Sequence, residues 1–266
     1  MIDVHRINAF TTEHGGGNPA GVVFDYALSE STMQRVAEKV GDSETVFITP
    51  REQGYQLTYY TPTQRVRLCG HATIAAIGWL RANGHISDGP LRLFTDAGEI
   101  AGRCEGTMNF LSVPIHSLEP LNSPRVAEML GFSVIDAHII DTGVREVYVR
   151  VDALSDLTPS LRATGDLASA HACAGVYLYA YSSPTRTLTA RNFLTPIGID
   201  EESATGTAAG GVGYLLTKDA PTARGLTIHQ GLTMASPSTL YVRPRINEAV
   251  SDVGGTIGFI ETINVL

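Results

Sequence analysis

Two stretches of small, uncharged residues constrain the fold of this chain more than any other feature of its sequence. His71–Leu80 reads HATIAAIGWL and Thr207–Leu216 reads TAAGGVGYLL, and neither contains Asp, Glu, Lys or Arg. A helix without a polar face is buried on all sides. Because most other segments alternate apolar and polar residues as strands do, we predict that each stretch is a helix wrapped by a β-sheet.

The two stretches have similar endings, which indicates an internal repeat. The run Gly78–Leu80 (GWL) aligns with Gly213–Leu215 (GYL) at a shift of 135 residues (213 minus 78), about half of the chain. We therefore predict two similar domains, each a curled sheet around one central helix, with a boundary near 117–123.

The remaining segments are mostly strand-like. Period-2 patterns predict strands at 4–10, 21–24, 45–49, 56–60, 91–95, 146–151, 175–181 and 240–243. Start signals predict two more helices, at 29–40 behind a serine and at 123–130 with proline in the first turn.

The composition is that of a compact soluble protein, since 43% of the 266 residues are hydrophobic and 17% are charged. A formal net charge of −8 disfavours nucleic acid and anionic membranes as partners. No apolar run reaches the roughly 18 residues of a transmembrane helix, and Met1–Phe10 alternates like a strand instead of forming a signal peptide. The cysteines (Cys69, Cys104 and Cys173) lack paired spacing and fit a cytoplasmic location.

The N-termini of the two predicted helices are candidate anion sites. A helix N-terminus presents unpaired backbone N–H groups and the positive end of the helix dipole. If a pseudo-twofold axis points both N-termini at one interdomain cleft, that cleft binds a carboxylate or a similar anion. The groups concerned are the backbone N–H groups around Gly70–His71 and Gly206–Thr207.

Three ionisable residues lie where they could transfer protons. His71 starts the first stretch, where the helix dipole disfavours imidazolium and keeps the ring neutral. Glu44 leads into the apolar run Val46–Ile48, where partial burial would raise its pKa toward a useful range. Glu202 precedes the second stretch, and two interpretations stay open for it: a complement to the helix dipole, or an acid/base group.

Cys69 differs from the other two cysteines because it directly precedes a helix N-terminus, which can make a thiol more acidic and reactive. Metal and nucleotide sites are not expected. The turn Gly15–Gly17 lacks the strand–GxGxxG–helix context and the Gly-Lys-Ser/Thr ending of phosphate loops. No His, Cys, Asp or Glu cluster has metal-ligand spacing in the sequence. We therefore predict neither a metal nor a cofactor.

Together these motifs resemble the phenazine-biosynthesis PhzF-like isomerases over nearly the whole chain. The matching runs, in the family's order, are 8–10 (NAF), 16–23 (GGNPAGVV), 43–47 (SETVF), 60–62 (YTP), 69–73 (CGHAT), 202–208 (ESATGTA), 230–231 (QG), Met234, 237–238 (PS) and 253–255 (VGG).

The resemblance implies a diaminopimelate-epimerase-like α+β fold. Its two domains, 1–118 and 119–266, would each be a mostly antiparallel β-barrel around a central helix, and the last strand could return to the first domain. It further implies a homodimer that works without a cofactor on a small acidic substrate. The site residues it implies are the catalytic Glu44, assisted by His71, Glu202 and Thr207, and the substrate-binding Asn18, Gly70, His71, Gly206 and Thr207.

The chain departs from the family in the late motif, where Glu-Asp-Pro-Ala-Thr-Gly-Ser is common and residues 201–207 read EESATGT. Glu202 stands in place of Asp, Ser203 of Pro and Thr207 of Ser. Racemases of the wider superfamily have cysteines at positions similar to Cys69 and Ser203, so a mechanism with two thiols is not available here.

Three functions follow from these observations. The leading hypothesis is a cofactor-independent isomerase in which Glu44 moves a proton on a carboxylate-bearing substrate in the interdomain cleft. The second is a racemase or epimerase that uses Cys69 with an opposing acid/base. The third is a noncatalytic protein that binds a small acid. A carboxylate beside an anion site would weaken simple binding, which favours catalysis.

Overall fold

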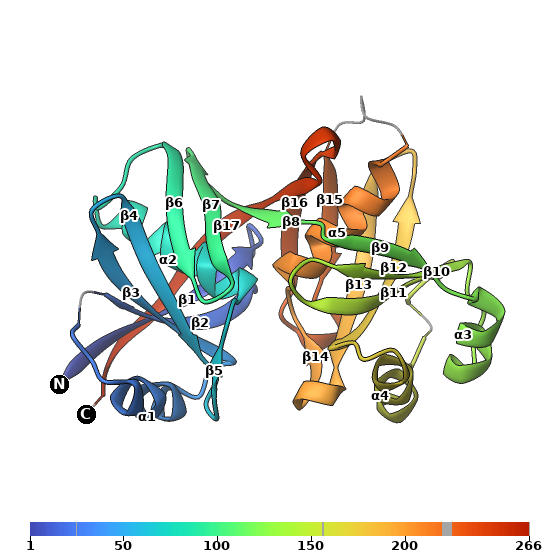
Figure 1. Ribbon diagram of the computed structural model, residues 1–266, viewed down its shortest axis with the longest axis horizontal. Coiled ribbons are helices and arrows are strands. Elements are labelled where there is room, and N and C mark those ends of the chain that lie inside the picture. Colours follow the sequence, from blue (N-terminus) through green and yellow to red (C-terminus); the bar gives the residue numbers. More distant parts are fainter. Residues whose placement is uncertain (25, 156, 220–224, 266) are drawn as a thin grey trace. The chain divides into compact units, whose positions relative to one another are not determined.

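Both uncharged stretches form buried helices in the computed structural model, which describes residues 1–24, 26–155, 157–219 and 225–265. Helix α2 (Gly70–Ala82) is buried from Gly70 to Leu80. Helix α5 (Gly206–Thr217) is buried from Gly206 to Gly213 and again at Thr217. The prediction of two buried helices in strand-rich surroundings is therefore confirmed (Figure 1).

The chain divides into two compact units. Unit 1 comprises Met1–Ser112 and Gly254–Leu266, and unit 2 comprises Val113–Val253. The sequence places the division after residue 118 and allows the last strand to return to the first domain. Strands β8 (Met108–Pro114) and β17 (Val250–Val265) each run across a unit boundary.

Unit 1 is a closed ring of strands around α2. Its further strands are β1 (Ile2–Thr11), β2 (Asn18–Phe24), β3 (Glu44–Arg51), β4 (Gly54–Tyr60), β5 (Arg65–Val66), β6 (Gly89–Thr95) and β7 (Gly98–Glu105). Neighbours pair antiparallel except β2–β3 and β4–β6, which are parallel. Parallel neighbours need a crossover connection, and α1 (Glu30–Val40) and α2 supply the two crossovers. Pairing of β17 with both β1 and β8 closes the ring.

Unit 2 repeats this order of pairings. Its elements are β9 (Ser117–Pro120), α3 (Ser123–Leu130), β10 (Asp136–Asp141), β11 (Arg145–Arg150), α4 (Leu161–Ala170), β12 (Gly175–Ser182), β13 (Thr187–Leu194), β14 (Ile199–Glu202), α5, β15 (Leu226–Gln230) and β16 (Ser238–Arg245). The parallel pairs are β11–β12, connected through α4, and β13–β15, connected through α5. The predicted α+β fold of two similar halves is confirmed.

Local capping explains why the predicted helices begin and end where they do. The Ser29 side chain accepts a hydrogen bond from the Thr32 N–H, and Gly41 ends α1 with a φ of 73°. Helix α3 begins behind Asn122, whose side chain accepts from the Arg125 N–H, and it ends at Gly131 with a φ of 78°. Helix α4 was not predicted, although Ser160 caps it in the same way.

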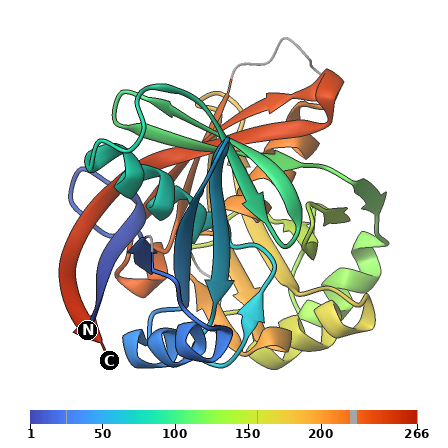
Figure 2. The ribbon, with the colours of Figure 1, turned by 60° about the vertical axis from the view of Figure 1, so that its left-hand side comes forward.

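The longest strand, β17, was also not predicted from sequence. It pairs antiparallel with β1 from Ile2–Val265 to Thr11–Thr256, with register shifts after Arg6 and after Ala9. Figure 2 shows the red strand β17 following the curve of the blue strand β1. Glycines at 254, 255 and 258 weaken the strand signal, and the bulges break its period of two.

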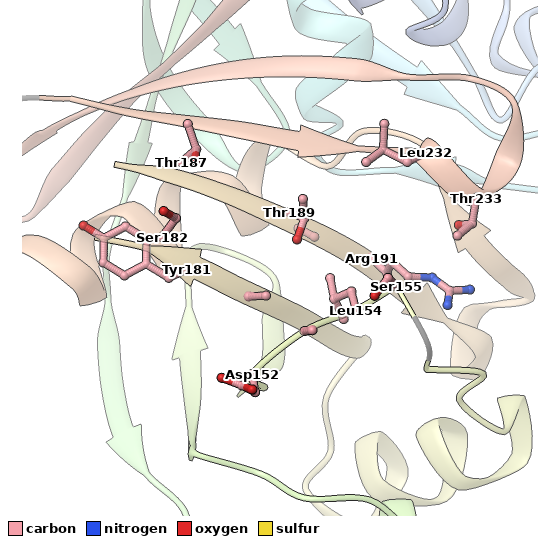
Figure 3. A pocket seen from close by; sticks show the side chains of 13 residues that line it. Asp152, Leu154, Ser155, Tyr181, Ser182, Thr187, Thr189, Arg191, Leu232 and Thr233 are labelled. Carbon is pink, nitrogen blue, oxygen red and sulfur yellow. The ribbon is translucent and has the colours of Figure 1, made fainter. Parts of the chain in front are cut away.

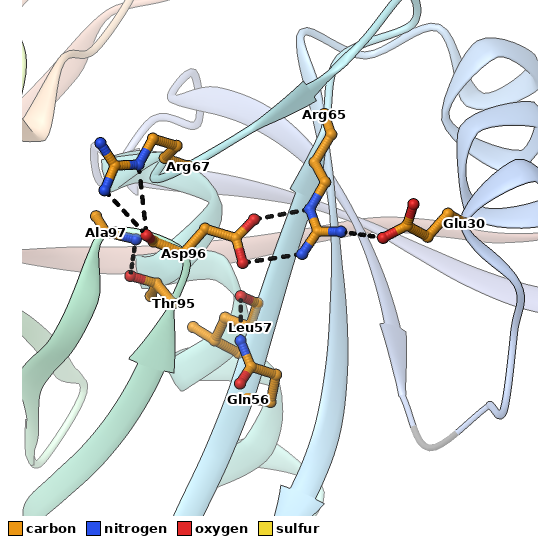
Figure 4. A network of polar contacts seen from close by, with 8 residues as sticks. All are labelled: Glu30, Gln56, Leu57, Arg65, Arg67, Thr95, Asp96 and Ala97. Carbon is orange, nitrogen blue, oxygen red and sulfur yellow. Dashed lines mark hydrogen bonds and ion pairs between the residues drawn. The ribbon is translucent and has the colours of Figure 1, made fainter.

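An exposed polar network fixes the segment that leads into α2 (Figure 4). The Arg65 guanidinium donates two hydrogen bonds to the Asp96 carboxylate, at 2.7 and 2.9 Å, and pairs with Glu30 in the first turn of α1. Arg67 donates to the Asp96 carbonyl oxygen at 3.2 and 3.4 Å. A bidentate pair within a network restrains geometry better than an isolated surface pair, so β5 is held against the β6–β7 turn.

The glycines of α5 allow close packing, which a substitution can test. A Cβ at Gly211 would lie 2.5 Å from Tyr148 Oη and 2.9 Å from Cζ. We expect Gly211→Ala to lower the free energy of unfolding by about 1–3 kcal/mol through overpacking, although helix propensity alone predicts a gain of about 1 kcal/mol. Urea denaturation measures the difference.

The matched control places Gly211→Ala in a Tyr148→Phe background, which removes the nearest oxygen. Relative to Tyr148→Phe alone, the alanine should then cost less. Equal stability of Gly211→Ala and the wild type would contradict this account of the packing.

Candidate active site

Glu44 is the first residue of β3, and an ion pair anchors the turn that precedes it. After Gly41 ends α1, Asp42 accepts two hydrogen bonds from the Arg6 guanidinium, at 2.9 Å from Nε and 2.6 Å from Nη2. The Asp42 side chain is only 4% exposed. In the β2–β3 pair, Glu44 lies opposite Ala20. The Glu44 side chain is therefore buried at the start of a central strand whose entry is rigidly held.

His71 brings the first group of predicted residues together. It is the second residue of α2 and is 2% exposed. Its Nε2 atom lies 3.3 Å from Glu44 Oε2 and 3.2 Å from Ser43 Oγ. Cys69, the residue that caps α2, places its Sγ atom 3.4 Å from His71 Nδ1. A carboxylate, an imidazole and a thiol thus meet at the N-terminus of a buried helix, where protons can move between neighbours.

Two hydroxyl contacts hold this helix start in place. Thr73 Oγ1 donates to the Cys69 carbonyl oxygen at 2.6 Å, and Tyr59 Oη lies 2.7 Å from Thr73 Oγ1. Tyr59 is fully buried on β4. The side chain of Cys69 makes no capping hydrogen bond to α2.

The same three residues form the one group of His, Cys, Asp and Glu, among the described residues, that could hold a metal ion. Their ligand atoms lie within 4.8 Å of one another, and these ligand types suit zinc. The sulfur lies 3.4 Å from Nδ1 of His71 and 3.9 Å from Nε2, the nitrogen that faces Glu44 Oε2 at 3.3 Å. The prediction that the protein binds no metal therefore stays a prediction.

The predicted substrate-binding residues of unit 1 lie at the start of α2 and on β2, the strand that pairs with the strand of Glu44. Asn18 is the buried first residue of β2, two positions before the Ala20 that lies opposite Glu44. Gly17 precedes it with a φ of +98°, and a Cβ there would lie 2.6 Å from the Ala9 carbonyl oxygen. Only glycine accommodates that conformation and that contact. Gly70 is the first residue of α2.

Unit 2 has a second polar group, at the start of α5. Glu202 is the last residue of β14 and is 8% exposed. The hydroxyl of Thr205 donates to Glu202 Oε2 and accepts from Asn192 Nδ2 at 3.0 Å and from Gln230 Nε2 at 3.1 Å. Gly206 and the buried Thr207 are the first two residues of α5, so Thr207 takes the helical position that His71 has in α2.

The sequence does not indicate the roles of four residues in and around this second group. Thr205 and Gln230 lie within motifs of the family resemblance, whereas Asn192 lies on β13, for which no strand is predicted. For Glu146 the sequence indicates only a strand position, between Arg145 and the apolar run Val147–Val149.

Glu146 is a fully buried carboxyl connected to Glu202 through this network. Its Oε1 atom accepts from Asn192 Nδ2 at 2.8 Å. Burial raises the pKa of Glu146 from 4.5 to about 8; the negative charge of Glu202 adds to the rise, and the Asn192 hydrogen bond opposes it. At neutral pH the carboxyl is therefore protonated and uncharged.

A cavity of about 400 Å³ lies elsewhere in unit 2, on β12, β13, the segment 152–155 and the 3₁₀ turn Leu232–Met234 (Figure 3). Its one guanidinium, Arg191, is paired with Glu201 at 2.7 Å and also donates to the Leu157 carbonyl oxygen. None of the predicted site residues lines this cavity.

These features define a class of protein. Each unit is a strand-rich shell around one buried helix, and ionisable groups gather where each helix begins. A protein from Agrobacterium radiobacter, described as a probable proline racemase, has this fold at a TM-score of 0.67 and 12% identity, covering 100% of this chain and 93% of that one. The fold is the diaminopimelate-epimerase-like fold, as predicted.

The chain belongs to the phenazine biosynthesis-like protein family, whose sequence profile it matches over residues 7–256. A PhzF-family protein from Bacillus anthracis is similar in structure, with a TM-score of 0.84 and 25% identity over 100% of this chain and 99% of that one. An uncharacterized isomerase from Deinococcus radiodurans is 34% identical over 96% of this chain and 92% of its own length. A second one, from Pseudomonas aeruginosa, is 31% identical over 78% of each chain. None of the described helices has the length and apolar character needed to cross a membrane.

The raised pKa of Glu146 gives a testable dependence of stability on pH. Between pH 4.5 and about 8 the folded protein keeps a proton that the unfolded chain has released. The unfolded state therefore binds fewer protons, and the contribution of Glu146 to the free energy of unfolding falls by about 1.4 kcal/mol per pH unit. Glutamine has no proton to lose at this position. We therefore expect the free energy of unfolding of Glu146→Gln, relative to that of the wild type, to increase with pH up to about pH 8 and to stay constant above it.

Urea denaturation at a series of pH values measures this difference. The control is Glu99→Gln, because a hydrogen bond from Arg92 lowers the pKa of that exposed carboxyl. The stability of this variant relative to the wild type should not increase toward alkaline pH. A stability difference for Glu146→Gln that does not change with pH would show that Glu146 is ionised throughout.

Proposed function

We propose that the protein is a cofactor-independent isomerase that moves a proton on a small carboxylate-bearing substrate, with Glu44 as the central acid/base. The observation that carries the proposal is the buried contact of 3.3 Å between Glu44 and His71 at the N-terminus of α2. Membership in the phenazine biosynthesis-like family and the isomerase names of the curated relatives support the reaction class.

The proposed reaction needs only groups that the chain supplies. Glu44 takes a proton from a carbon next to a carboxylate or a conjugated system, and the electron pair left behind delocalises into that group. The protonated Glu44 then returns the proton to another carbon of the same system, so the double bond moves and no atom is gained or lost. His71 either polarises the Glu44 carboxyl or relays its proton.

The backbone N–H groups at the start of α2, around Gly70 and His71, would hold the substrate carboxylate and stabilise the charge that develops on it. We propose the same role for Gly206 and Thr207 at the start of α5, with Glu202 assisting proton transfer. Because Glu202 is one methylene longer than the aspartate common in the family, the substrate would lie differently from theirs. That both groups act on one substrate stays a prediction, as does the homodimer, which sedimentation analysis tests.

One observation supports the racemase alternative. Cys69 Sγ lies 3.4 Å from His71 Nδ1, a contact that favours a reactive thiolate. In that reaction Cys69 would exchange a proton on one face of a carbon and an opposing acid/base would act on the other. Substitution of the two candidate bases separates the two mechanisms.

The first test is Glu44→Gln. The substitution is nearly isosteric but cannot transfer a proton, so the rate should fall by about 10²–10⁴-fold while folding and binding persist. The assay incubates the enzyme in heavy water with a panel of small unsaturated and amino carboxylic acids and follows C–H exchange by NMR. The wild type should exchange one substrate hydrogen, and His71→Asn should lose less activity than Glu44→Gln.

If Glu44→Gln exchanged the substrate hydrogen at the wild-type rate, the base would have to be Glu202 or Cys69 instead of Glu44. A second single variant tests whether the two groups serve one reaction. Glu202→Gln should lower the exchange of the same substrate hydrogen that Glu44→Gln lowers. Binding of an acid from the panel without any exchange would favour the noncatalytic alternative.

The second test concerns the thiol. If Cys69 only packs beside His71, Cys69→Ser should retain most of the exchange activity, within about tenfold of the wild type. The matched control is Cys173→Ser, since Cys173 lies in the apolar core of unit 2. Loss of activity in Cys69→Ser alone, with folding and binding intact, would make the racemase mechanism the better one.

A further inference from the structure

The buried carboxyl Glu146 has no role in the reaction proposed above, and its position demands an explanation. It is fully buried, and among the described residues its Oε2 atom has no hydrogen-bond partner. The hydroxyls of Tyr148 and Tyr177 are likewise buried without partners there. A buried polar group costs free energy unless it is hydrogen-bonded, so apolar packing alone does not account for a glutamate at this place.

The hydrogen bonds around Thr205 fix the direction of its hydroxyl proton. Asn192 uses both hydrogens of its amide, one to Glu146 Oε1 at 2.8 Å and one to Thr205 Oγ1 at 3.0 Å. Gln230 also uses both, one to the Glu202 carbonyl oxygen at 2.8 Å and one to Thr205 Oγ1 at 3.1 Å. A hydroxyl oxygen has two lone pairs, and these two amides fill them. The Thr205 proton is therefore directed to Glu202 Oε2.

We propose that Glu146 is a positioning residue for Glu202: its Oε1 atom holds the Asn192 amide in the orientation that directs the Thr205 proton to Glu202. The proposal deepens the proposed function and rests on it for the catalytic use of Glu202. Glu202 then accepts a fixed hydrogen bond at Oε2, which orients its carboxyl group for proton exchange with a substrate.

The chemistry of an amide explains why an acceptor is needed behind Asn192. The two ends of the group are nearly the same shape, so Asn192 could turn over and present Oδ1 to Thr205. That oxygen would compete with Glu202 for the hydroxyl proton. Glu146 Oε1 lies 2.8 Å from Nδ2 and favours the orientation in which Nδ2 faces it.

An uncharged acid suits this position better than a carboxylate. No Lys or Arg side chain hydrogen-bonds to Glu146 among the contacts of the described residues. A negative charge on Glu146 would therefore have no positively charged hydrogen-bond partner among the described residues. Burial, with the added effect of the Glu202 charge, accordingly raises the pKa of Glu146 to about 8.

The test is NMR of the Asn192 side-chain amide in protein labelled with ¹⁵N-asparagine, assigned with an Asn192→Asp variant. In the wild type the amide signal should shift with a midpoint near pH 8, as Glu146 ionises. Glu146→Gln keeps an acceptor and should leave the signal at its neutral-pH position with no titration. Glu146→Leu removes the acceptor, so the signal should move and its hydrogens should exchange faster with solvent.

A wild-type signal that does not titrate, or one that is unmoved in a folded Glu146→Leu protein, would overturn the proposal. Should Glu146→Leu fail to fold, the comparison of the wild type with Glu146→Gln still decides. The exchange assay supplies the catalytic readout: kcat should fall by about 10–100-fold in Glu146→Leu, with KM little changed, and Glu146→Gln should restore it. If the wild type exchanges no acid of the panel, the proposed function fails while the NMR result for Glu146 stands.

Discussion

The burial of two helices on every side is the constraint on which the rest of this structure depends. A helix inside a ring of strands cannot carry charge, and its backbone must approach the sheet closely. That is why glycine occurs where neighbouring side chains press inward: Gly78 faces Ile257, Gly210 faces Val113 and Gly213 faces Val242, with Cβ distances of 2.5–2.8 Å if alanine replaced them. In an exposed helix each such glycine would cost about 1 kcal/mol relative to alanine, and here close packing reverses that preference.

Burial of the helices also determines where polar chemistry is possible. Only a helix end offers unpaired N–H groups that can compensate a negative charge, so buried carboxyl groups near α2 and α5 are best tolerated there. Glu44 has the imidazole of His71 at 3.3 Å, and Glu202 has the hydroxyl of Thr205. Glu146 accepts a hydrogen bond from the Asn192 amide, and burial raises its pKa to about 8.

The sequence predicted the helices, and it singled out the residues that meet at the start of α2, because both depend on local signals. Uncharged composition identified α2 and α5, a start signal at Ser29 identified α1, and proline in the first turn identified α3. The family motifs singled out Glu44 and His71, with Cys69 as an alternative acid/base. What it did not predict depends on pairing between distant residues. Strand β17 is specified by its register with β1, 245–263 residues away in the chain, and its glycines weaken the local pattern. The Glu146–Asn192–Thr205 chain joins β11, β13 and the start of α5, and no spacing in the sequence brings those three together.

The two units share an order of strands and crossovers but present different chemistry at equivalent helix starts. Helix α2 is preceded by Cys69 and has His71 at its second position; helix α5 is preceded by Thr205 and has Thr207 there. One start carries an imidazole and a thiol, which can accept and release protons, whereas the other carries hydroxyls, which donate or accept hydrogen bonds. In unit 2 the ionisable group is Glu202, on the strand that precedes the helix. The Thr205 hydroxyl, which accepts hydrogen bonds from two side-chain amides, donates to it. Each buried helix requires small, uncharged residues along its length, so only its first turn is free to differ between the two units. In a duplicated scaffold of this kind, one half can therefore carry groups for proton transfer while the other orients a second carboxylate.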